Sequence, residues 1–368
     1  MNGAQTAERI AREARALGFT TTGASPLAAS PRSAFVTAWL AEGRAGEMAW
    51  LARRTAERTD PRRRFPWAAS VVSLAYPYRP PPPPPDDWRT SLRGRIAAYA
   101  RGADYHDRVL ALLESLAERL RRWWPSARFR PYVDTGPLLE RELAARAGLG
   151  WVGKHTLLLG RGGSWFFLAE LVTDLLVESA SADTDHCGGC TRCLAACPTD
   201  ALTPYAMDPR RCLSYLTIEH RSAIPLELRP KLENWIFGCD ACQEACPWNG
   251  DAADGTDAAW LTPSLPELLA LDAAGFRARF GKTAVTRTKR RGLLRNVAVA
   301  LGNSGNRDAV PSLTAALGDR EPLVRGHAAW ALGRIGGELA RAALERAARN
   351  EIDAAVVEEV RSARSAAG

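Results

Sequence analysis

All eight cysteines of this 368-residue chain lie between positions 187 and 246, and no other feature constrains the fold as strongly. The first four follow the pattern Cys-x2-Cys-x2-Cys-x3-Cys-Pro and end at Cys197. Bacterial ferredoxins bind [4Fe–4S] clusters with this run, and its fourth cysteine ligates the other cluster. A second run ends at Cys246 and lacks one cysteine, while Cys212 lies upstream. The eight cysteines therefore match the eight ligand positions of two clusters.

The crossing of the fourth cysteine predicts how the ligands divide between the two clusters. Iron in these clusters prefers thiolates, and the tight loops allow backbone amides to donate to the cluster. A pair of tetrahedral zinc sites is the alternative, but zinc sites need neither the triple run nor the proline after it. The predicted first cluster takes Cys187, Cys190, Cys193 and Cys246, and the second takes Cys197, Cys212, Cys239 and Cys242.

The N-terminal segment, residues 1–18, has the Ala, Arg and Glu pattern of an amphipathic helix. It lacks the apolar stretch and the cleavage site of an export signal, and it has no twin arginine. No window approaches eighteen uninterrupted apolar residues, so we expect no membrane span. We therefore predict a cytoplasmic protein, in which closely spaced cysteines are metal ligands more often than disulfides.

The length predicts two or three domains. Helix-like and strand-like segments alternate over residues 1–177, which favours an α/β or α+β layer fold with strands near 71–76 and 129–133 and a helix over 107–123. All the cysteines fall in residues 178–255, and residues 256–368 have helical patterns almost throughout. We therefore predict an α+β multidomain protein with a ferredoxin-like centre and a helical C-terminal part.

Six consecutive prolines occupy positions 80–85 and must form an extended polyproline segment. We interpret it as a surface loop, because residues 71–76 and 96–99 on either side resemble parts of one core. The alternative is a linker between domains.

The C-terminal part contains an internal repeat. The segment Asn296–Gly305 matches His327–Gly336 in its small and apolar positions at a period of 31, as in HEAT-like helical repeats. Two repeats cannot bury a solenoid core alone, so we expect them to pack on the rest of the chain and present a face to a partner.

Longer motifs resemble those of epoxyqueuosine reductases. The resemblance covers nearly the whole chain, including the repeats. It is carried by Tyr132–Glu142, Ala147–Lys154, Gly163–Trp165, Arg211–His220 and Ile236–Asn249.

The resemblance implies an oxidoreductase that reduces epoxyqueuosine to queuosine at the wobble position of tRNA and depends on cobalamin. Residues 1–177 would be its cobalamin-binding catalytic domain, residues 178–255 its electron relay, and residues 256–368 its tRNA-binding repeats. The chain has no Asp-x-His-x-x-Gly element, which is the histidine-bearing loop of many cobalamin proteins. This absence is consistent with the base-off binding that the family uses.

The resemblance makes Asp134 the proton donor, because the family's motif places that role at this position. Asp134 follows a short apolar strand and precedes Thr-Gly-Pro, which predicts a helix that Gly148 ends. The structural alternative is that Asp134 only caps this helix. Arg141, inside the predicted helix, would position the aspartate or a phosphate, or would be a solvated helix residue.

The predicted cobalamin contacts are Asp134 and three further residues in stretches that the family uses near its corrin: Tyr99, Ser214 and Tyr215. An aromatic residue beside a strand is more often part of the core. His155 and His220 are interpreted as structural or surface residues, because nothing in the sequence pairs either one with a ligand.

The chain carries a formal net charge of +8, which favours polyanions such as nucleic acid where the charge clusters. Such a cluster precedes the first repeat, and phosphate contact is its natural role. A solvated charged linker is the alternative. The predicted tRNA contacts are Arg141, Lys282, Arg287, Lys289, Arg290, Arg291 and Arg295.

Three alternatives to the reductase remain at this stage. A reductive dehalogenase also joins cobalamin to two such clusters, but it usually carries a twin-arginine signal and has no use for a basic repeat tail. A ferredoxin-type electron-transfer module would bind no corrin and would not act on RNA. A zinc-stabilised RNA-binding protein would be colourless. We expect a monomer that receives its electrons from an external low-potential donor.

Overall fold

The computed structural model describes residues 1–78, 87–250 and 262–366. The chain divides into two compact units, and each is interleaved with the other in sequence. The first unit comprises Met1–Pro80, Asp104–Pro209 and Ala241–Ala253, and the second comprises Pro81–Ala103, Arg210–Asp240 and Asp254–Gly368. Within the described ranges, no helix combines the length and the apolar character needed to cross a membrane.

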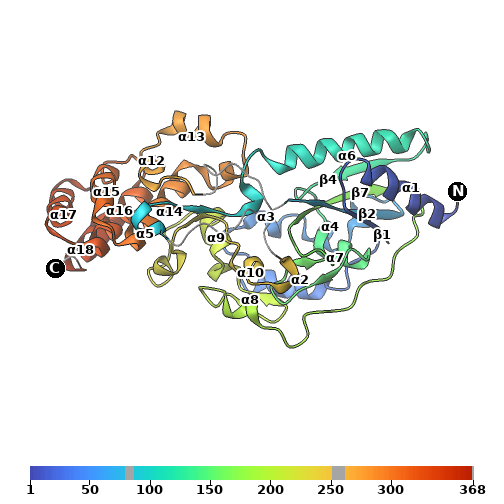
Figure 1. The fold of residues 1–368 in the computed structure, drawn as a ribbon, viewed down its shortest axis with the longest axis horizontal. Coiled ribbons are helices and arrows are strands. Elements are labelled where there is room, and N and C mark those ends of the chain that lie inside the picture. Colours follow the sequence, from blue (N-terminus) through green and yellow to red (C-terminus); the bar gives the residue numbers. More distant parts are fainter. Residues whose placement is uncertain (79–86, 251–261, 367–368) are drawn as a thin grey trace. The chain divides into compact units, whose positions relative to one another are not determined.

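The first unit is built on an antiparallel sheet of four strands in the order β1-β2-β7-β4. Side chains of successive residues in a strand point to opposite faces, so the run of buried residues in β2 serves both faces of the sheet. Figure 1 shows this sheet with its helices. The strands are β1 (Thr21–Pro26), β2 (Ser70–Pro77), β7 (Phe166–Thr173) and β4 (Phe129–Tyr132).

One face of the sheet packs against helices α1 (Gly3–Arg15) and α6 (Tyr105–Arg121). Leucines spaced three or four residues apart on α6 are buried there, because that spacing places them on one side of a helix. The other face packs against α7 (Glu140–Arg146), where Leu143 shares a core with Val71 and Val172. The predicted strands and the predicted helix over 107–123 are confirmed, with the helix starting two residues earlier.

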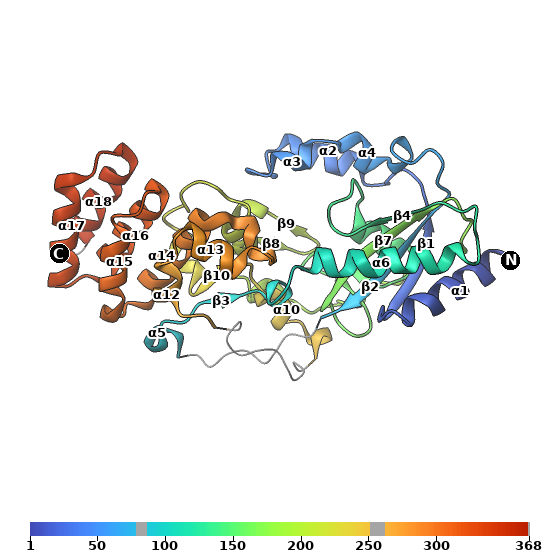
Figure 2. The ribbon, with the colours of Figure 1, turned by 90° about the horizontal axis from the view of Figure 1, so that it is seen from above.

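Short elements complete the first unit, and several of them are labelled in Figure 2. Cys193 and Cys242 lie in two of its short helices. Pairs of two-residue strands form hairpins, β5 with β6 and β8 with β9. The bounds of these elements are α2 Ser33–Ala41, α3 Ala49–Ala52, α4 Thr55–Thr59, η1 Pro61–Arg63, β5 Trp151–Val152, β6 Leu158–Leu159, α8 Arg192–Ala195, β8 Leu202–Thr203, β9 Ala206–Met207, α10 Ala241–Glu244 and η5 Pro247–Asn249.

The second unit is mainly helical around a parallel pair of short strands, β3 (Arg95–Ile96) and β10 (Trp235–Phe237). Its remaining elements are α5 Trp88–Ser91, η2 Ala98–Ala100, η3 Pro209–Arg211, α9 Leu213–Ile218, η4 Arg229–Leu232, α12 Leu265–Leu269, α13 Ala273–Phe280, η6 Ala284–Thr288, α14 Lys289–Ser304, η7 Arg307–Ala309, α15 Val310–Ala316, α16 Pro322–Ile335, α17 Glu338–Asn350 and α18 Ala354–Ala366.

The predicted repeat corresponds to helices α14 and α16, which pack on each other, and α16 packs on α18 in turn. A Cβ atom on Gly302 would lie 2.8 Å from the Cα of Ala331, and one on Gly333 would lie 2.7 Å from the Cα of Ala363. These glycines occupy the same place in the 31-residue repeat, so close helix packing explains why a small residue recurs there.

The repeat helices share one core with Ile218, Ile236 and Phe237 of the cysteine-rich segment. The expectation that the repeats pack on the rest of the chain is therefore confirmed.

The proposal that residues 71–76 and 96–99 belong to one core is wrong. Leu74 lies in the core of the first unit, whereas Ile96 lies in the core of the second. Similar apolar composition did not show which core each segment joins, since that depends on distant partners. The prolines themselves lie outside the described residues.

Candidate functional site

Asp134 lies in a turn between strand β4 and helix α7, and it does not cap a helix. Helix α7 begins at Glu140 with Leu139 at the N-cap position and ends before Gly148, so the predicted helix is confirmed with a later start, and the alternative that Asp134 caps it is wrong. Asp134 has φ = 56°, a left-handed conformation that is uncommon for a residue with a side chain. Its side chain is 61% exposed, which leaves the carboxylate accessible from solvent.

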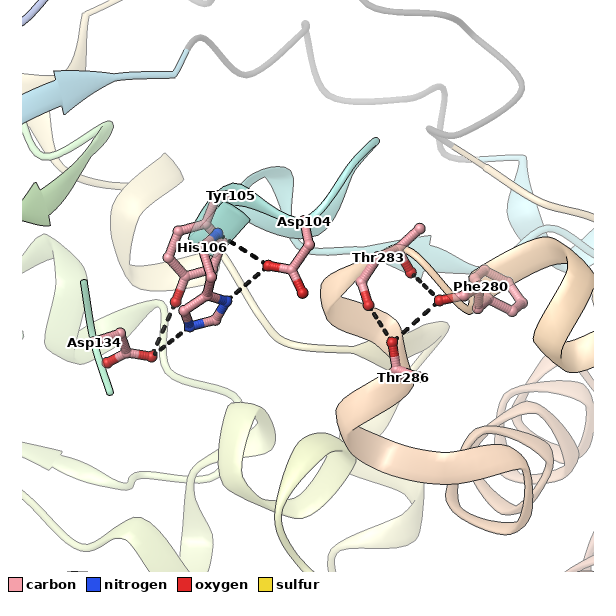
Figure 3. Close-up of polar contacts among 7 residues, drawn as sticks. All are labelled: Asp104, Tyr105, His106, Asp134, Phe280, Thr283 and Thr286. Atoms are coloured by element: carbon pink, nitrogen blue, oxygen red, sulfur yellow. Dashed lines mark hydrogen bonds and ion pairs between the residues drawn. The ribbon is translucent and has the colours of Figure 1, made fainter. Parts of the chain in front are cut away.

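The Asp134 carboxylate is held by two residues from the start of α6, as Figure 3 shows. The Tyr105 hydroxyl donates to Asp134 Oδ2 over 2.9 Å, and His106 Nε2 lies 3.3 Å from the same oxygen. The other ring nitrogen, His106 Nδ1, lies 2.7 Å from Asp104 Oδ1. Asp104 also accepts the backbone N–H of His106 and caps α6. A chain of polar contacts thus runs from Asp104 through His106 to Asp134.

The two aspartates change the acid–base properties of His106. Burial lowers the pKa of the imidazole, but hydrogen bonds to Asp134 and Asp104 and their negative charges outweigh this effect and raise it. The positively charged form is favoured because it donates from both ring nitrogens. Sequence reasoning missed Asp104, Tyr105 and His106, although Asp104 has the sequence position of a helix cap.

Two carboxyl groups near Asp134, those of Glu140 and Glu170, influence each other and Asp134 electrostatically. Glu170 on β7 is completely buried, and a side-chain hydrogen bond joins its carboxyl group to that of Glu140, which two carboxyl groups form only when one of them holds a proton. Burial and the neighbouring charge of Glu140 raise its pKa well above the ordinary range. Burial and the charge of Asp134 raise the pKa of Glu140 to about 8. The pair therefore holds protons that carboxyl groups in water would release.

Arg141 follows Glu140 in α7 and is exposed at the surface. Its guanidinium donates to the backbone oxygen of Thr156. His155, beside this contact, is buried and accepts a hydrogen bond from the backbone N–H of Leu157 at Nδ1. Burial and the charge of Arg141 lower the pKa of His155 to about 4, so the ring stays neutral and structural, as predicted.

The four thiols of the predicted first cluster act on one another electrostatically. Burial raises the pKa of Cys193, and the neighbouring Cys246 and Cys187 raise it further. Burial also raises the pKa of Cys246, to which Cys187 and Cys190 contribute. Backbone N–H groups donate to the sulfurs of both Cys193 and Cys246. Mutual electrostatic influence among these four thiols, with amides donating to two of them, agrees with the predicted ligand set of the first cluster.

Two side chains that sequence reasoning did not single out shape the first cysteine loop. Lys154 is buried, and its Nζ donates to the backbone oxygens of Gly188 at 2.6 Å and Cys190 at 2.9 Å. Asp185 accepts the backbone N–H of Cys187 at 2.9 Å. The sequence feature that could have identified Lys154 is its position at the end of the Gly-Trp-Val-Gly-Lys motif.

Within the first unit, polar side chains link the segment after Cys242 to the Gly163–Trp165 motif. Asn249 Oδ1 accepts the backbone N–H of Ser164 at 2.6 Å, and Asn249 Nδ2 donates to the backbone oxygen of Gln243 at 2.6 Å. Gln243 Nε2 donates to Ser164 Oγ at 3.0 Å. The Gly163–Trp165 motif and the segment after Cys242 are therefore parts of one network.

The predicted ligands of the second cluster come from both units: Cys197 and Cys242 from the first, Cys212 and Cys239 from the second. Cys197 Sγ accepts the backbone N–H of Ala201 at 3.3 Å.

The predicted corrin contacts Tyr99, Ser214 and Tyr215 all belong to the second unit. The Tyr99 ring lies 6.2 Å from that of Phe237 and packs on the core, and Tyr215 is buried in α9. His220, near Tyr215, hydrogen-bonds through Nε2 with the backbone oxygen of Ala223.

The basic stretch before the repeats contains both buried and solvent-exposed residues. Arg295 is completely buried and donates to the backbone oxygens of Leu216, His220 and Ser222, so its proposed contact with phosphate is wrong. Arg290 is largely buried in a bidentate pair with Asp319 and does not present a free charge. The exposed members are Lys282, Arg287, Lys289 and Arg291, of which Arg287 pairs with Glu219.

Three family models match parts of the chain. The model for "Epoxyqueuosine reductase QueG, DUF1730" matches residues 58–135. A 4Fe-4S double cluster binding domain matches residues 186–249, and HEAT repeats match residues 285–364.

Whole proteins are similar over most of their length. The epoxyqueuosine reductase of Xanthomonas campestris is 41% identical over 341 residues, covering 90% of this chain and 96% of that protein. The Escherichia coli K12 enzyme of the same name is 38% identical and covers 89% of both chains. A crystal structure of epoxyqueuosine reductase with an epoxyqueuosine-modified tRNA-Tyr stem loop matches all of both chains with a TM-score of 0.90 and 30% identity.

Proposed function

The chain belongs to the epoxyqueuosine reductase family, and we infer that it reduces epoxyqueuosine in tRNA to queuosine, the last step of queuosine biosynthesis. The observation that carries this inference is 41% identity over nine-tenths of the chain to an epoxyqueuosine reductase. Converting an epoxide to an alkene takes two electrons and two protons and releases water. The enzyme is therefore an oxidoreductase that needs an electron path and a proton donor.

Iron–sulfur clusters in the cysteine-rich segment relay the electrons. In our proposal the first cluster is bound by Cys187, Cys190, Cys193 and Cys246, and the mutual influence of these thiols supports this set. Cys197, Cys212, Cys239 and Cys242 bind the second.

Cobalamin is the proposed cofactor at the reacting carbon. When bound, it supplies a reduced cobalt that reacts with carbon. The sequence has no Asp-x-His-x-x-Gly loop, so the proposal is a base-off cobalamin with no lower ligand from such a loop. Tyr99, Ser214 and Tyr215 are the proposed corrin contacts.

Asp134 is the proposed proton donor to the departing oxygen. Its exposure and its position in a turn rather than at a helix cap support this role, because a cap would direct the carboxylate toward backbone amides. The left-handed conformation of Asp134 is a local strain of the kind that concentrates at functional sites.

The substrate is proposed to contact the exposed basic residues that precede the repeats, Lys282, Lys289 and Arg291, with Arg287 beside Glu219. Lysine and arginine neutralise phosphates and release counterions, which supplies affinity without reading sequence. Arg141 would act at Thr156 as a positioning residue. The proposal includes an external low-potential electron donor, a monomeric state and a cytoplasmic location.

The test is to purify the protein without oxygen, measure iron and cobalt, and assay epoxyqueuosine-containing tRNA with a strong reductant. We expect about eight iron atoms per chain, bound cobalamin and the alkene product. Zinc in place of iron, or no product with the loaded enzyme, would contradict the proposal.

Asp134→Asn keeps the size of the side chain and removes the acid. We expect it to retain iron and cobalamin and to lose turnover by about 10² to 10⁴-fold. Full activity in this variant would remove Asp134 from the mechanism.

A further inference from the structure

We propose that His106, oriented by Asp104, is a proton relay that returns a proton from solvent to Asp134 in each turnover. The inference rests on the proposed function, in which Asp134 gives a proton to the departing oxygen. The reaction consumes two protons for each alkene formed, so the donor must be recharged before the next substrate reacts.

The geometry of His106 suits a relay because its two nitrogens face different acids. Nδ1 lies 2.7 Å from Asp104 Oδ1, and Nε2 lies 3.3 Å from Asp134 Oδ2. Asp104 Oδ1 also accepts the backbone N–H of His106 at 3.0 Å. One carboxylate oxygen therefore fixes both the start of the helix and the direction of the ring. With a proton held on Nδ1 by Asp104, Nε2 is the atom that exchanges a proton with Asp134.

Stacking fixes the plane of the His106 ring. The ring lies 4.0 Å from that of Tyr105 with an interplanar angle of 28°, and Tyr105 stacks on Phe167 of β7 at 4.2 Å and 5°. The Tyr105 hydroxyl donates to Asp134 Oδ2 as well, but a phenol ordinarily has a pKa near 10 and is a weak proton source at neutral pH. Imidazole titrates close to neutrality and is the better source.

The charges around the relay favour a proton on the imidazole and allow its replacement. Asp104 and Asp134 face His106 directly, while Glu140, Glu170 and Arg141 act on Asp134 from α7 and β7. The His106 side chain is 32% exposed, so water reaches it. The step balances: the imidazolium loses the Nε2 proton to the Asp134 carboxylate, the ring becomes neutral, and water then protonates the ring again.

A purely structural role is the competing explanation, because Asp104 alone suffices as a helix cap. The two explanations differ in pH dependence. A relay loses turnover as pH rises through the raised pKa of His106, whereas a packing role has no such dependence.

The first experiment is His106→Gln, which keeps a polar side chain but cannot carry the proton. At pH 7.5 we expect kcat to fall by about 10²-fold with little change in KM. The difference in kcat between the variant and the wild type should become smaller at acidic pH, where solvent protonates Asp134 directly. Added imidazole should restore part of the variant's rate. A loss that is equal at every pH and is not rescued by imidazole would overturn the relay.

The second experiment compares Asp104→Asn with Asp107→Asn. Asparagine still caps a helix, so Asp104→Asn removes the charge beside His106 while the cap remains. We expect its rate to decline at a lower pH than in the wild type. Asp107 is exposed in the first turn of the same helix, and Asp107→Asn removes an equal charge away from His106. The pH profile of this control should stay unchanged, and equal shifts in both variants would contradict the proposal.

An NMR titration of the His106 ring makes the inference separable from the enzymatic proposal. The pKa should be above that of an ordinary histidine and should fall in Asp104→Asn. If the pKa does not fall, the relay is wrong even when the enzyme is active. If the wild type shows these pKa values but forms no queuosine, the proposed function fails instead.

Discussion

Two sets of buried polar side chains, one in each unit, differ in the kind of partner that they have. In the second unit, Arg295 and Asn296 are completely buried and form hydrogen bonds to each other and to backbone oxygens. In the first unit Glu170 is equally buried, but its partner is a second carboxyl group, that of Glu140, so the pair is stable only while it holds a proton. The first arrangement stabilises a fold. The second costs stability, and it lies beside the proposed proton donor.

This contrast shows how to separate structural from functional polarity when both are hidden from solvent. A satisfied network serves as a framework, because it connects segments that are distant in sequence. A carboxyl pair with raised pKa values marks a place where proton chemistry is favoured over stability.

The largest expected effect on stability follows from removing Arg295. Arg295→Met keeps much of the volume but leaves two buried acceptors, the backbone oxygen of Leu216 and Asn296 Oδ1, without their donors. We expect a loss of about 3 kcal/mol or more in the free energy of unfolding, since each unsatisfied buried group costs about 1 to 3 kcal/mol. Denaturant unfolding measures the loss. A change below about 1 kcal/mol would show that the network is not a framework.

Close packing of the repeat helices gives the next largest effect. Gly302→Ala places a Cβ atom 2.8 Å from the Cα of Ala331, so α14 and α16 must separate. We expect destabilisation of about 1 to 3 kcal/mol, measured as a lower midpoint of thermal unfolding. The matched control is Gly318→Ala, where the new Cβ atom meets only the backbone oxygen of Ala315 at 3.5 Å. Equal effects in the two variants would contradict the packing explanation.

The buried carboxyl pair predicts a stability that depends on pH. A carboxyl group with a raised folded-state pKa stabilises the fold most below its ordinary pKa of 4.5 and loses that contribution as pH rises. The free energy of unfolding should therefore decrease between pH 4.5 and about 8, the pKa of Glu140. Glu170→Gln removes one titrating group, so the free energy of unfolding of this variant should decrease less than that of the wild type over the same pH range.

The control for this slope is Glu118→Gln, at an exposed position on α6 of the same unit. It should keep the wild-type dependence on pH. Denaturant unfolding at a series of pH values provides the measurement, and a Glu170→Gln slope equal to that of the wild type would contradict the assignment.

The smallest effect compares two adjacent arginines of the basic stretch. Arg291 is exposed, whereas Arg290 is paired with Asp319. If Arg291 contacts a tRNA phosphate, Arg291→Ala should weaken tRNA binding. The slope of the logarithm of the binding constant against the logarithm of the salt concentration should also become shallower by about one. Arg290→Ala should mainly lower stability. Filter binding or anisotropy over a range of salt concentrations distinguishes them, and an unchanged salt slope in Arg291→Ala would exclude this contact.

Some features of this protein were determined by the sequence alone. The cysteine spacing indicated clusters because tight loops bring thiolates together whatever the rest of the chain does. The leucine spacing indicated α6, and the 31-residue period indicated repeats whose glycines meet a neighbouring helix. Each of these depends on interactions between residues close in sequence or on a repeated local pattern.

Only the tertiary structure showed which polar residues stabilise the fold and which belong to the proposed catalytic site. Nothing near Arg295 in the sequence shows that its donors are used by carbonyls more than 70 positions away. Nothing near Asp134 shows that it is held by Tyr105 and His106 instead of capping a helix. Burial and pairing depend on partners that folding brings together from distant positions, and local sequence carries little information about them.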